Sequence, residues 1–346
     1  MSQEPKILVT LGPSSLDAAI IRSMDECGVF VFRINMSHTP IELLEPMIEK
    51  IQAATNTPIC IDSEGAQIRT RRLQNGSADL KPGSSVTLHF NDQPGDAHNL
   101  SFSPTGAAAG FRKGDLIDID FHGAQLQVVD VNETVGRAEV IKGGSIGENK
   151  AVALDREHGL PPMTEKDLAA VPRAAEMGLG YYALSFAGSA VDVDSFRAHA
   201  GEGAYIIAKI ESRRGLRNLA EIADAADAIL IDRGDLSREI PIAAIPFAQR
   251  HIVDEVRRHD KPVFVATNLL ETMVERSEPN RAEVNDIVST LEMGASGLVL
   301  AAETAIGAYP LAAVRMSRRL IDCYGAWSSA GSFDAFLEDF IDGSEP

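Results

Sequence analysis

Eight short apolar runs, most of them followed by an amphipathic stretch, restrict the folds open to this chain of 346 residues. Each run carries apolar and often β-branched side chains at nearly every position, which is typical of strands buried on both faces of a parallel sheet. The runs begin at residues 6, 29, 57, 181, 204, 228, 261 and 297. Eight strand–helix units predict an α/β protein whose strands close into a (β/α)8 TIM barrel.

A stretch of different character separates the third run from the fourth. It contains short segments between Gly, Asn and Asp turns, including "DLIDIDFHG" and "RAEVIKGG", and this pattern predicts short strands. A structureless loop of about 100 residues is implausible in a compact domain. We therefore predict a small all-β domain over residues 71–158, inserted after the third strand, with the barrel formed by residues 1–70 and 159–327.

The last residues, 328–346, differ again. The segment "SSAGS" at 328–332 predicts a flexible linker. After it, apolar side chains recur at the spacing of one helical face and acidic residues occupy the other faces; the apolar residues are Phe333, Phe336, Leu337, Phe340 and Ile341. This pattern predicts a short acidic amphipathic helix over 333–342, which either packs on its own barrel or docks on a protein partner.

The formal net charge of −18 narrows the classes of partner. Such a charge disfavours binding to nucleic acid or to anionic membranes, so an anionic substrate must be held by a local cluster of Arg and Lys. No apolar stretch approaches the roughly 20 residues of a membrane helix, and the N-terminal residues lack the pattern of a signal peptide. Three dispersed cysteines suit reduced thiols, and we expect a cytoplasmic protein.

Polar residues collect at the carboxyl ends of the predicted strands, where TIM barrels hold their chemistry. Lys209 and Glu211 stand two positions apart at the end of the fifth run, so their side chains share a face. Glu211 and Asp235 can each offer an oxygen to Mg²⁺, while Arg33, Arg69 and Lys209 can offset phosphate charge. This set suits phosphoryl transfer; a structural ring of ion pairs at the barrel mouth is the alternative.

Several linked segments then give the chain a specific likeness. These segments are "RINMSH", "IDSEGAQIRT", "AKIES", "DRGDLSREIP", "ATNLLETM", "PNRAEVNDI" and "AAETAIGAYP". They follow one another in the order and spacing of pyruvate kinases, and the inserted β domain stands where that family has its lid. Over about residues 5–325 the chain resembles the pyruvate kinase family, and this resemblance implies the roles that follow.

By this resemblance, Lys209 stabilises the phosphoryl group in flight, Glu211 and Asp235 hold Mg²⁺ or Mn²⁺, and Arg33 and Arg69 engage phosphate. The positions that match a K⁺ site are Asn35, Ser37, Asp62 and the carbonyl of Ser63. The carboxylate of phosphoenolpyruvate is received by Thr267, counted among the catalytic residues, and by the backbone around Gly234. The positions that match the ADP/ATP site are Pro13, Asn35, His38, Arg69 and the lid residue Lys150.

The chain also departs from the family pattern. Ala301 replaces a serine linked to enolate protonation, Glu64 reverses a positive charge, and Gln67 replaces a glutamate tied to potassium dependence. The lid reads Phe121-His122-Gly123 in place of an acidic pair before a glycine, and "SFAGSA" lacks the family's arginine. The family's large C-terminal regulatory domain is replaced by the linker and acidic helix, so we expect at most a homodimer through the barrel.

These departures leave three functions open. The first is phosphoryl transfer between phosphoenolpyruvate and ADP through a Mg-bound enolate, slow or altered in acceptor. The second is a Mg²⁺-dependent aldolase, lyase or decarboxylase acting on a pyruvate-type enolate, because the stretch from Lys209 to Asp235 also resembles such enzymes. The third is a non-catalytic regulatory or binding protein that is recruited through its acidic tail.

Overall fold

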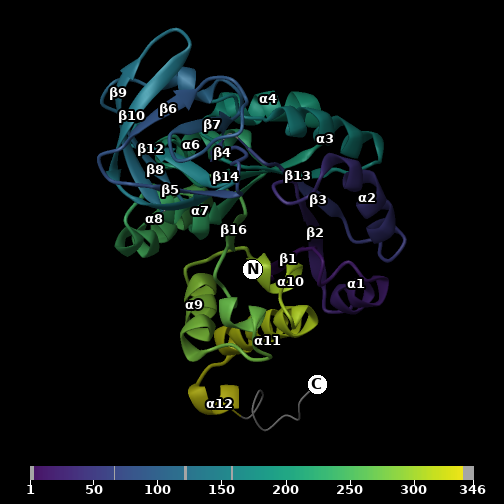
Figure 1. Cartoon of the computed structure of the whole chain (residues 1–346). Coiled ribbons are helices and arrows are strands. Elements are labelled where there is room, and N and C mark those ends of the chain that lie inside the picture. The colour runs from purple at the N-terminus through teal and green to yellow at the C-terminus, as the bar shows by residue number, and fades with distance from the viewer. Residues whose placement is uncertain (1–3, 66, 121–122, 157–158, 338–346) are drawn as a thin grey trace. The chain divides into compact units, whose positions relative to one another are not determined.

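The computed structural model describes residues 4–65, 67–120, 123–156 and 159–337, and the chain divides into two compact units (Figure 1). The first unit comprises residues 1–64 and 165–346, and the second comprises residues 65–164. In the first unit, eight parallel strands close into a barrel in the order β1-β17-β16-β15-β14-β13-β3-β2. The predicted (β/α)8 barrel is therefore confirmed.

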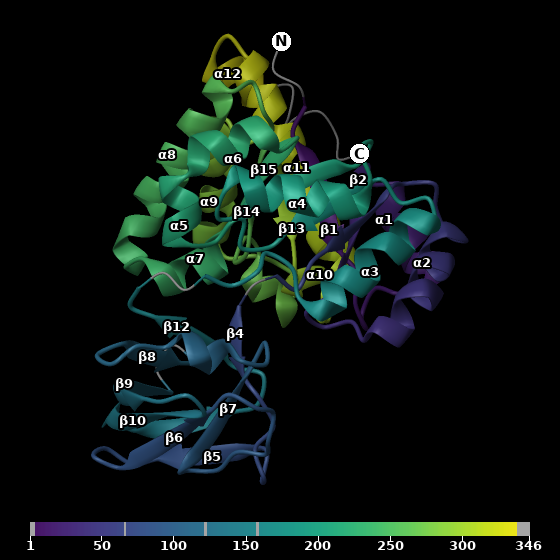
Figure 2. The ribbon, with the colours of Figure 1, turned by 90° about the horizontal axis from the view of Figure 1, so that it is seen from above.

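The strands of this barrel coincide with the eight apolar runs. They are β1 (Lys6–Thr10), β2 (Val29–Asn35), β3 (Ile59–Asp62), β13 (Tyr181–Leu184), β14 (Tyr205–Ile210), β15 (Ala228–Asp232), β16 (Val263–Ala266) and β17 (Gly297–Leu300). Both faces of each strand are covered, because one face lines the barrel interior and the other packs under the surrounding helices, as Figure 2 shows. Leu8, Ile207, Leu230, Phe264 and Val299 are among the fully buried interior residues.

Helices occupy the connections between the strands. They are α1 (Ala18–Asp25), α2 (Leu44–Gln52), α3 (Glu165–Glu176), α4 (Ala190–Ala200), α5 (Arg213–Arg217), α6 (Leu219–Ala225), α7 (Arg233–Glu239), α8 (Ile245–Arg258), α9 (Arg281–Glu292), α10 (Ala302–Ala305), α11 (Pro310–Ser329) and α12 (Phe333–Leu337). Polar side chains cap several of their N-termini: Asp17 caps α1, Ser189 caps α4 and Asn280 closes a capping box with Glu283 on α9. None of the described helices is both long and apolar enough to cross a membrane.

The second unit contains the predicted all-β domain. Seven strands close in the order β10-β6-β7-β4-β12-β8-β9, and β11 pairs with β5 in a separate two-stranded sheet. These strands are β4 (Ile68–Thr70), β5 (Ser77–Leu80), β6 (Ser85–His89), β7 (Asn99–Ser103), β8 (Leu116–Ile119), β9 (Ala124–Val131), β10 (Val135–Lys142), β11 (Gly144–Gly147) and β12 (Ala151–Leu154). They enclose a core of their own that includes Val86, Leu88, Ile117 and Leu126.

The boundary between the two units differs from the prediction at one strand. The predicted boundary places residues 68–70 in the large barrel, but they form β4, which pairs with β7 and β12 of the second unit. The reason is that a strand of three residues carries no periodicity of its own, so only its partners decide its sheet.

The C-terminal segment differs from the prediction as well. The expected linker begins inside α11, which continues to Ser329, so residues 328–329 are helical. Helix α12 follows, and the rings of Phe333 and Phe336 stand edge-on to Trp327, with centroids 6.4 and 5.6 Å away. Phe340 and Ile341 lie outside the described residues. Phe333 and Phe336 of α12 thus contact Trp327 of α11, the chain's own last barrel helix.

Candidate active site

Lys209 lies at the centre of the carboxyl ends of the barrel strands. Its Nζ is 2.8 Å from Oε1 of Glu211, 3.4 Å from Oδ1 of Asp62 and 3.6 Å from Oδ2 of Asp232. It also donates a hydrogen bond of 3.1 Å to Oγ of Ser185. Burial by itself would lower the pKa of Lys209, but the three carboxylates outweigh burial and hold this pKa above its ordinary value. Lys209 is therefore a buried, permanently cationic group.

Arg33 supplies a second buried cation. It is the fifth residue of β2, and its Nη2 donates to Oδ2 of Asp62 at 2.7 Å. Its Nε and Nη1 are buried and lack any hydrogen-bond partner among the described residues. Leaving charged donors buried and unsatisfied is costly, so such donors usually serve a ligand. Because an arginine fork matches phosphate and carboxylate geometry, these two nitrogens are suited to an anion.

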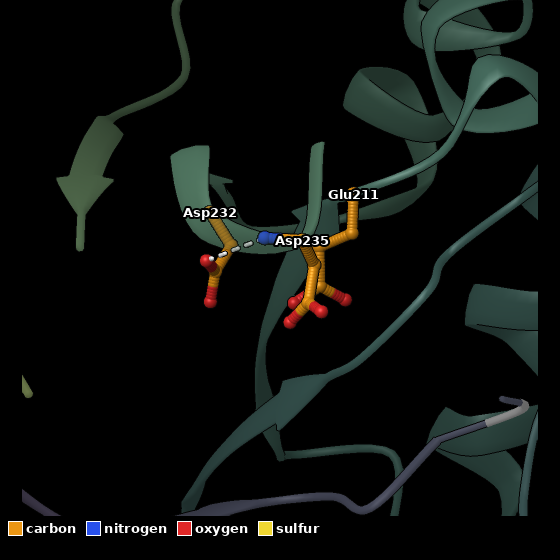
Figure 3. A group of neighbouring side chains, drawn as sticks. All are labelled: Glu211, Asp232 and Asp235. Carbon is orange, nitrogen blue, oxygen red and sulfur yellow. Dashed lines mark hydrogen bonds between the residues drawn. The ribbon is translucent and has the colours of Figure 1, made fainter. Parts of the chain in front are cut away.

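Three carboxylates form an acidic cluster beside Lys209. Glu211, Asp232 and Asp235 each place one oxygen within 4.8 Å of the others, and Figure 3 shows the carboxylates of Glu211 and Asp235 together with that of Asp232 beside them. Glu211 is fully buried, and burial together with Asp232 and Asp235 raises its pKa to about 8, against the opposing effect of Lys209. Oε2 of Glu211 accepts the N–H of Phe186 at 2.5 Å, whereas Oε1 faces Lys209 without hydrogen-bond geometry.

The composition of this centre fits a divalent cation. The three cluster carboxylates and Asp62 outnumber the cations that face them, Lys209, Arg33 and Arg238, by one when all are ionised. Carboxylate oxygens are the ligands of Mg²⁺ and Mn²⁺, and Oε1 of Glu211 is buried without a hydrogen bond. Asp235 also pairs with Arg238 at 3.1 Å. Glu211 and Asp235, the predicted metal ligands, thus lie together.

Asp232 is a member of the cluster that sequence reasoning missed. Its Oδ1 accepts hydrogen bonds from Oγ1 of Thr267 (2.6 Å), the N–H of Gly234 (3.1 Å) and the N–H of Asp235 (3.4 Å). Burial opposes its ionisation, but Lys209 and the Thr267 hydroxyl outweigh burial and lower the pKa of Asp232. The available signal was its place as the last residue of strand β15, where barrel enzymes hold their chemistry.

Ser185 is the second residue that sequence reasoning missed. It follows strand β13, and it links Lys209 and Ser63 in the centre. Its hydroxyl accepts from Lys209 Nζ at 3.1 Å and donates to the carbonyl of Ser63 at 2.7 Å, while its N–H donates to Oγ of Ser63. A serine has one hydroxyl proton, so the bond to Ser63 leaves its lone pairs for the lysine.

Thr267 is held in an unusual backbone conformation. Its φ is +73° and that of Asn268 is +55°, values that are rare outside glycine and most strained for a β-branched residue. Arg233 secures this turn, because its guanidinium donates to the carbonyls of Thr267 and Asn268 and pairs with Asp286 at 2.6 Å. Gly234 lies against Thr267, where an added Cβ would be 3.0 Å from Cγ2. The predicted carboxylate receptor is therefore a preformed turn.

The oxygens predicted for K⁺ have partners inside the protein. Oδ1 of Asn35 accepts the N–H of Ser37, both oxygens of Asp62 face Arg33 or Lys209, and the Ser63 carbonyl accepts from Ser185. Asn35 and Asp62 are neighbours in the register of β2 and β3. The structure thus brings these residues together at one edge of the barrel.

Glu64, one of the departures from the family pattern, has two local partners. Its carboxylate is 3.9 Å from Nζ of Lys166, and its N–H donates to Asp167 at 2.7 Å. Lys166 also donates to the carbonyl of Met36. The reversed charge at residue 64 is thus matched by a lysine at the start of α3.

The remaining predicted residues fall into two groups. Pro13 and His38 are exposed and follow β1 and β2 in the first unit. Arg69 and Lys150 belong to the second unit, where Arg69 donates to the carbonyl of Asn149 and Lys150 pairs with Asp120 at 3.2 Å. Oε1 of Gln67, in the same unit, is buried without a hydrogen-bond partner among the described residues. Phe121 and His122 of the lid lie outside the described residues.

A cavity of about 760 Å³ opens next to Thr267. Ala301 lines it, together with Glu303 of α10, whose buried carboxylate accepts the N–H groups of Leu270 and Ala301. The side chain of Ala301 is a methyl group, which can neither donate nor relay a proton.

Comparisons with known proteins identify the family of the chain. The family model for the pyruvate kinase barrel domain matches residues 2–314. A pyruvate kinase of Mycobacterium tuberculosis is 32% identical over 330 residues, covering 93% of this chain and 70% of that protein. A pyruvate kinase of Aeropyrum pernix is 36% identical over 327 residues, covering 91% of this chain and 69% of that protein.

A solved structure adds to the sequence matches. The crystal structure of a pyruvate kinase from Cryptosporidium parvum aligns with a TM-score of 0.84 at 28% sequence identity, covering 99% of this chain and 72% of that one. The match in fold and the match in sequence thus extend over nearly the whole chain. The chain belongs to the pyruvate kinase family.

Proposed function

We propose that this protein is a pyruvate-kinase-type phosphotransferase that moves a phosphoryl group between phosphoenolpyruvate and ADP. The observation that carries the proposal is the pairing of an anion site with an acidic cluster: two unsatisfied nitrogens of Arg33 lie in the same centre as Lys209 and three carboxylates. Phosphoryl transfer depends on positioning and charge neutralisation, and this centre is built from both signs of charge.

Each residue then has a role that its contacts support. Arg33 engages the phosphoryl oxygens through Nε and Nη1, and Lys209 offsets the charge that develops on the group in flight. Thr267 and the N–H of Gly234 are the donors that this function assigns to the substrate carboxylate, and within the protein both donate to Oδ1 of Asp232. Arg69 and Lys150 serve the nucleotide phosphates, with Pro13, Asn35 and His38 beside the nucleotide.

Glu211 and Asp235 would hold Mg²⁺ or Mn²⁺, and the bound ion would supply charge neutralisation for the substrate. A K⁺ bound by Asn35, Ser37, Asp62 and Ser63 belongs to the same proposal. Protonation of the enolate carbon is slow in this chain, since Ala301 has no exchangeable proton.

Two observations favour this function over an aldolase, lyase or decarboxylase acting on a pyruvate enolate. The second unit supplies a domain where the family has a lid, and a kinase needs water excluded from the phosphoryl group. The free nitrogens of Arg33 also suit a phosphorylated ligand better than plain pyruvate. A non-catalytic role would leave the strained turn at Thr267 without a purpose.

Assembly through the barrel is part of the proposal as well. Ile242 and Phe247, at the start of the α8 region, are 80% and 71% exposed, which suits a homodimer interface. The acidic segment 333–342 remains a proposed contact for a protein partner.

The test is a phosphorus NMR assay with phosphoenolpyruvate, ADP and Mg²⁺, with and without K⁺. Formation of ATP supports the proposal, and Lys209→Met should abolish it, whereas the exposed-site variant Asp254→Asn should not. Turnover of oxaloacetate or a hydroxy-keto acid without ATP would favour the lyase function. No turnover of either class, with partner binding that depends on the tail, would favour the non-catalytic role.

A further inference from the structure

Asp232 occupies the donors that the proposed function reserves for the substrate carboxylate. Its Oδ1 accepts hydrogen bonds from the Thr267 hydroxyl (Oγ1, 2.6 Å) and from the N–H of Gly234 (3.1 Å). The hydroxyl of Thr267 has one proton, and that proton is given to Asp232. A second carboxylate cannot take the same proton while Asp232 keeps it.

The position of Asp232 is held from two sides. As the N-cap of α7, it also accepts the N–H of Asp235, which fixes the side chain against the helix. Its other oxygen, Oδ2, faces Nζ of Lys209 at 3.6 Å. One carboxylate of the chain thus spans the distance between the turn at Thr267 and the ammonium group of Lys209.

Charge adds to this competition. A substrate carboxylate placed on the same donors would lie beside the carboxylate of Asp232 and meet its like charge. The phosphoryl end of a ligand does not meet this obstacle, because the free nitrogens of Arg33 have no internal competitor among the described residues.

We propose that Asp232 is a specificity-determining residue: its own carboxylate takes the place of the substrate carboxylate on Thr267 and Gly234. The inference rests on the proposed function, since that function assigns these donors to the substrate. The ligand class that the centre then selects is a phosphate ester recognised through phosphate and metal, with little gain from a carboxylate on the same molecule.

The test compares two probes, phosphoenolpyruvate and inorganic phosphate, by calorimetry at saturating Mg²⁺ in wild type, Asp232→Ala, Asp232→Asn and the control Asp254→Asn. Removing the negative charge of Asp232 should tighten the binding of both anions. The informative quantity is therefore the ratio of the two dissociation constants. Asp232→Ala should raise the preference for phosphoenolpyruvate over phosphate at least tenfold, because it frees the donors. Asp232→Asn should raise this preference less than Asp232→Ala does, since its amide oxygen still accepts from Thr267 and Gly234 although its charge is gone.

Other outcomes decide against the proposal. An unchanged ratio in Asp232→Ala would overturn it. It would also be overturned if Asp232→Ala bound both probes equally more weakly and lost Mn²⁺ binding, measured by electron paramagnetic resonance. That result would assign Asp232 to the metal alone. If Asp232→Ala does not fold, Asp232→Gly replaces it, because glycine is well tolerated at an N-cap. ATP formation by the wild type tests the proposed function separately, so an active wild type with an unchanged ratio rejects this inference alone.

Discussion

Binding of a divalent cation should depend on pH through one carboxyl group, Glu211. Its pKa is raised to about 8, chiefly by burial and further by Asp232 and Asp235. A metal ion binds the ionised carboxylate, so below this pKa a proton must leave before the ion can bind. The expected direction is tighter binding as the pH rises, with a plateau above pH 8.

The magnitude follows from this pKa and a single proton. Between about pH 6.5 and about pH 8.5, the dissociation constant for Mn²⁺ should fall about 25-fold, and near pH 7 each ion should release about 0.9 proton. The affinity is measured by electron paramagnetic resonance across this range. The proton release is measured by calorimetry in buffers of different ionisation enthalpy.

Two variants distinguish the contribution of Glu211 to this pH dependence from that of other carboxyl groups. Glu211→Gln keeps the shape of the side chain but cannot ionise, so it should bind Mn²⁺ more weakly and lose the pH dependence. Glu239→Gln is the matched control, because Glu239 is a second carboxyl group whose pKa is raised by burial, and this variant should keep the dependence. A flat affinity profile in wild type, or a slope that survives in Glu211→Gln, would refute the assignment of the proton to this residue.

Three further predictions concern other parts of the protein. Arg33→Met should weaken inorganic phosphate binding about 10- to 100-fold, measured by calorimetry, because a charge-assisted fork is lost; unchanged affinity would contradict the anion site. Ala301→Ser should speed pyruvate formation about 10²-fold by restoring a hydroxyl that relays a proton, measured with a coupled steady-state assay, and an unaltered kcat would exclude this residue from proton delivery. Deletion of residues 333–346 should shift the emission of Trp327, the single tryptophan, to the red because Phe333 and Phe336 no longer cover it; an identical spectrum would show that the contact does not form in solution.

The stability of the metal-free protein provides a related check on the sign of the Glu211 shift. A carboxyl group whose folded pKa lies above its ordinary value of 4.5 keeps its proton in the folded state over a range where the unfolded chain has lost it. Its contribution to stability is therefore present below about pH 4.5 and is lost as the pH rises through about 8. Added Mn²⁺ should raise the melting temperature more at pH 8 than at pH 6.

Much of the site follows from local spacing in the sequence. Lys209 and Glu211 stand two positions apart on one strand, and strand geometry alone places them on one side. Arg33 and Asp235 follow from the rule that a barrel presents its chemistry at the carboxyl ends of its strands. Asp232 is not predicted as a site residue because its place in the sequence also suits a plain helix cap. Ser185 is not predicted because a serine after a strand is common. Only the contact of Asp232 with Thr267 and that of Ser185 with Lys209 reveal their part in the centre.

The sequence by itself determined the barrel and the inserted β domain, because the period of apolar side chains is a local property that each segment carries in full. Tertiary structure alone decided that β4 pairs in the second unit, that residues 328–329 continue a helix, and that two nitrogens of Arg33 are buried without internal partners. It also decided that Asp232 meets Thr267, 35 positions away along the chain. Pairing, burial and charge compensation depend on groups far apart in sequence, so no local pattern contains them.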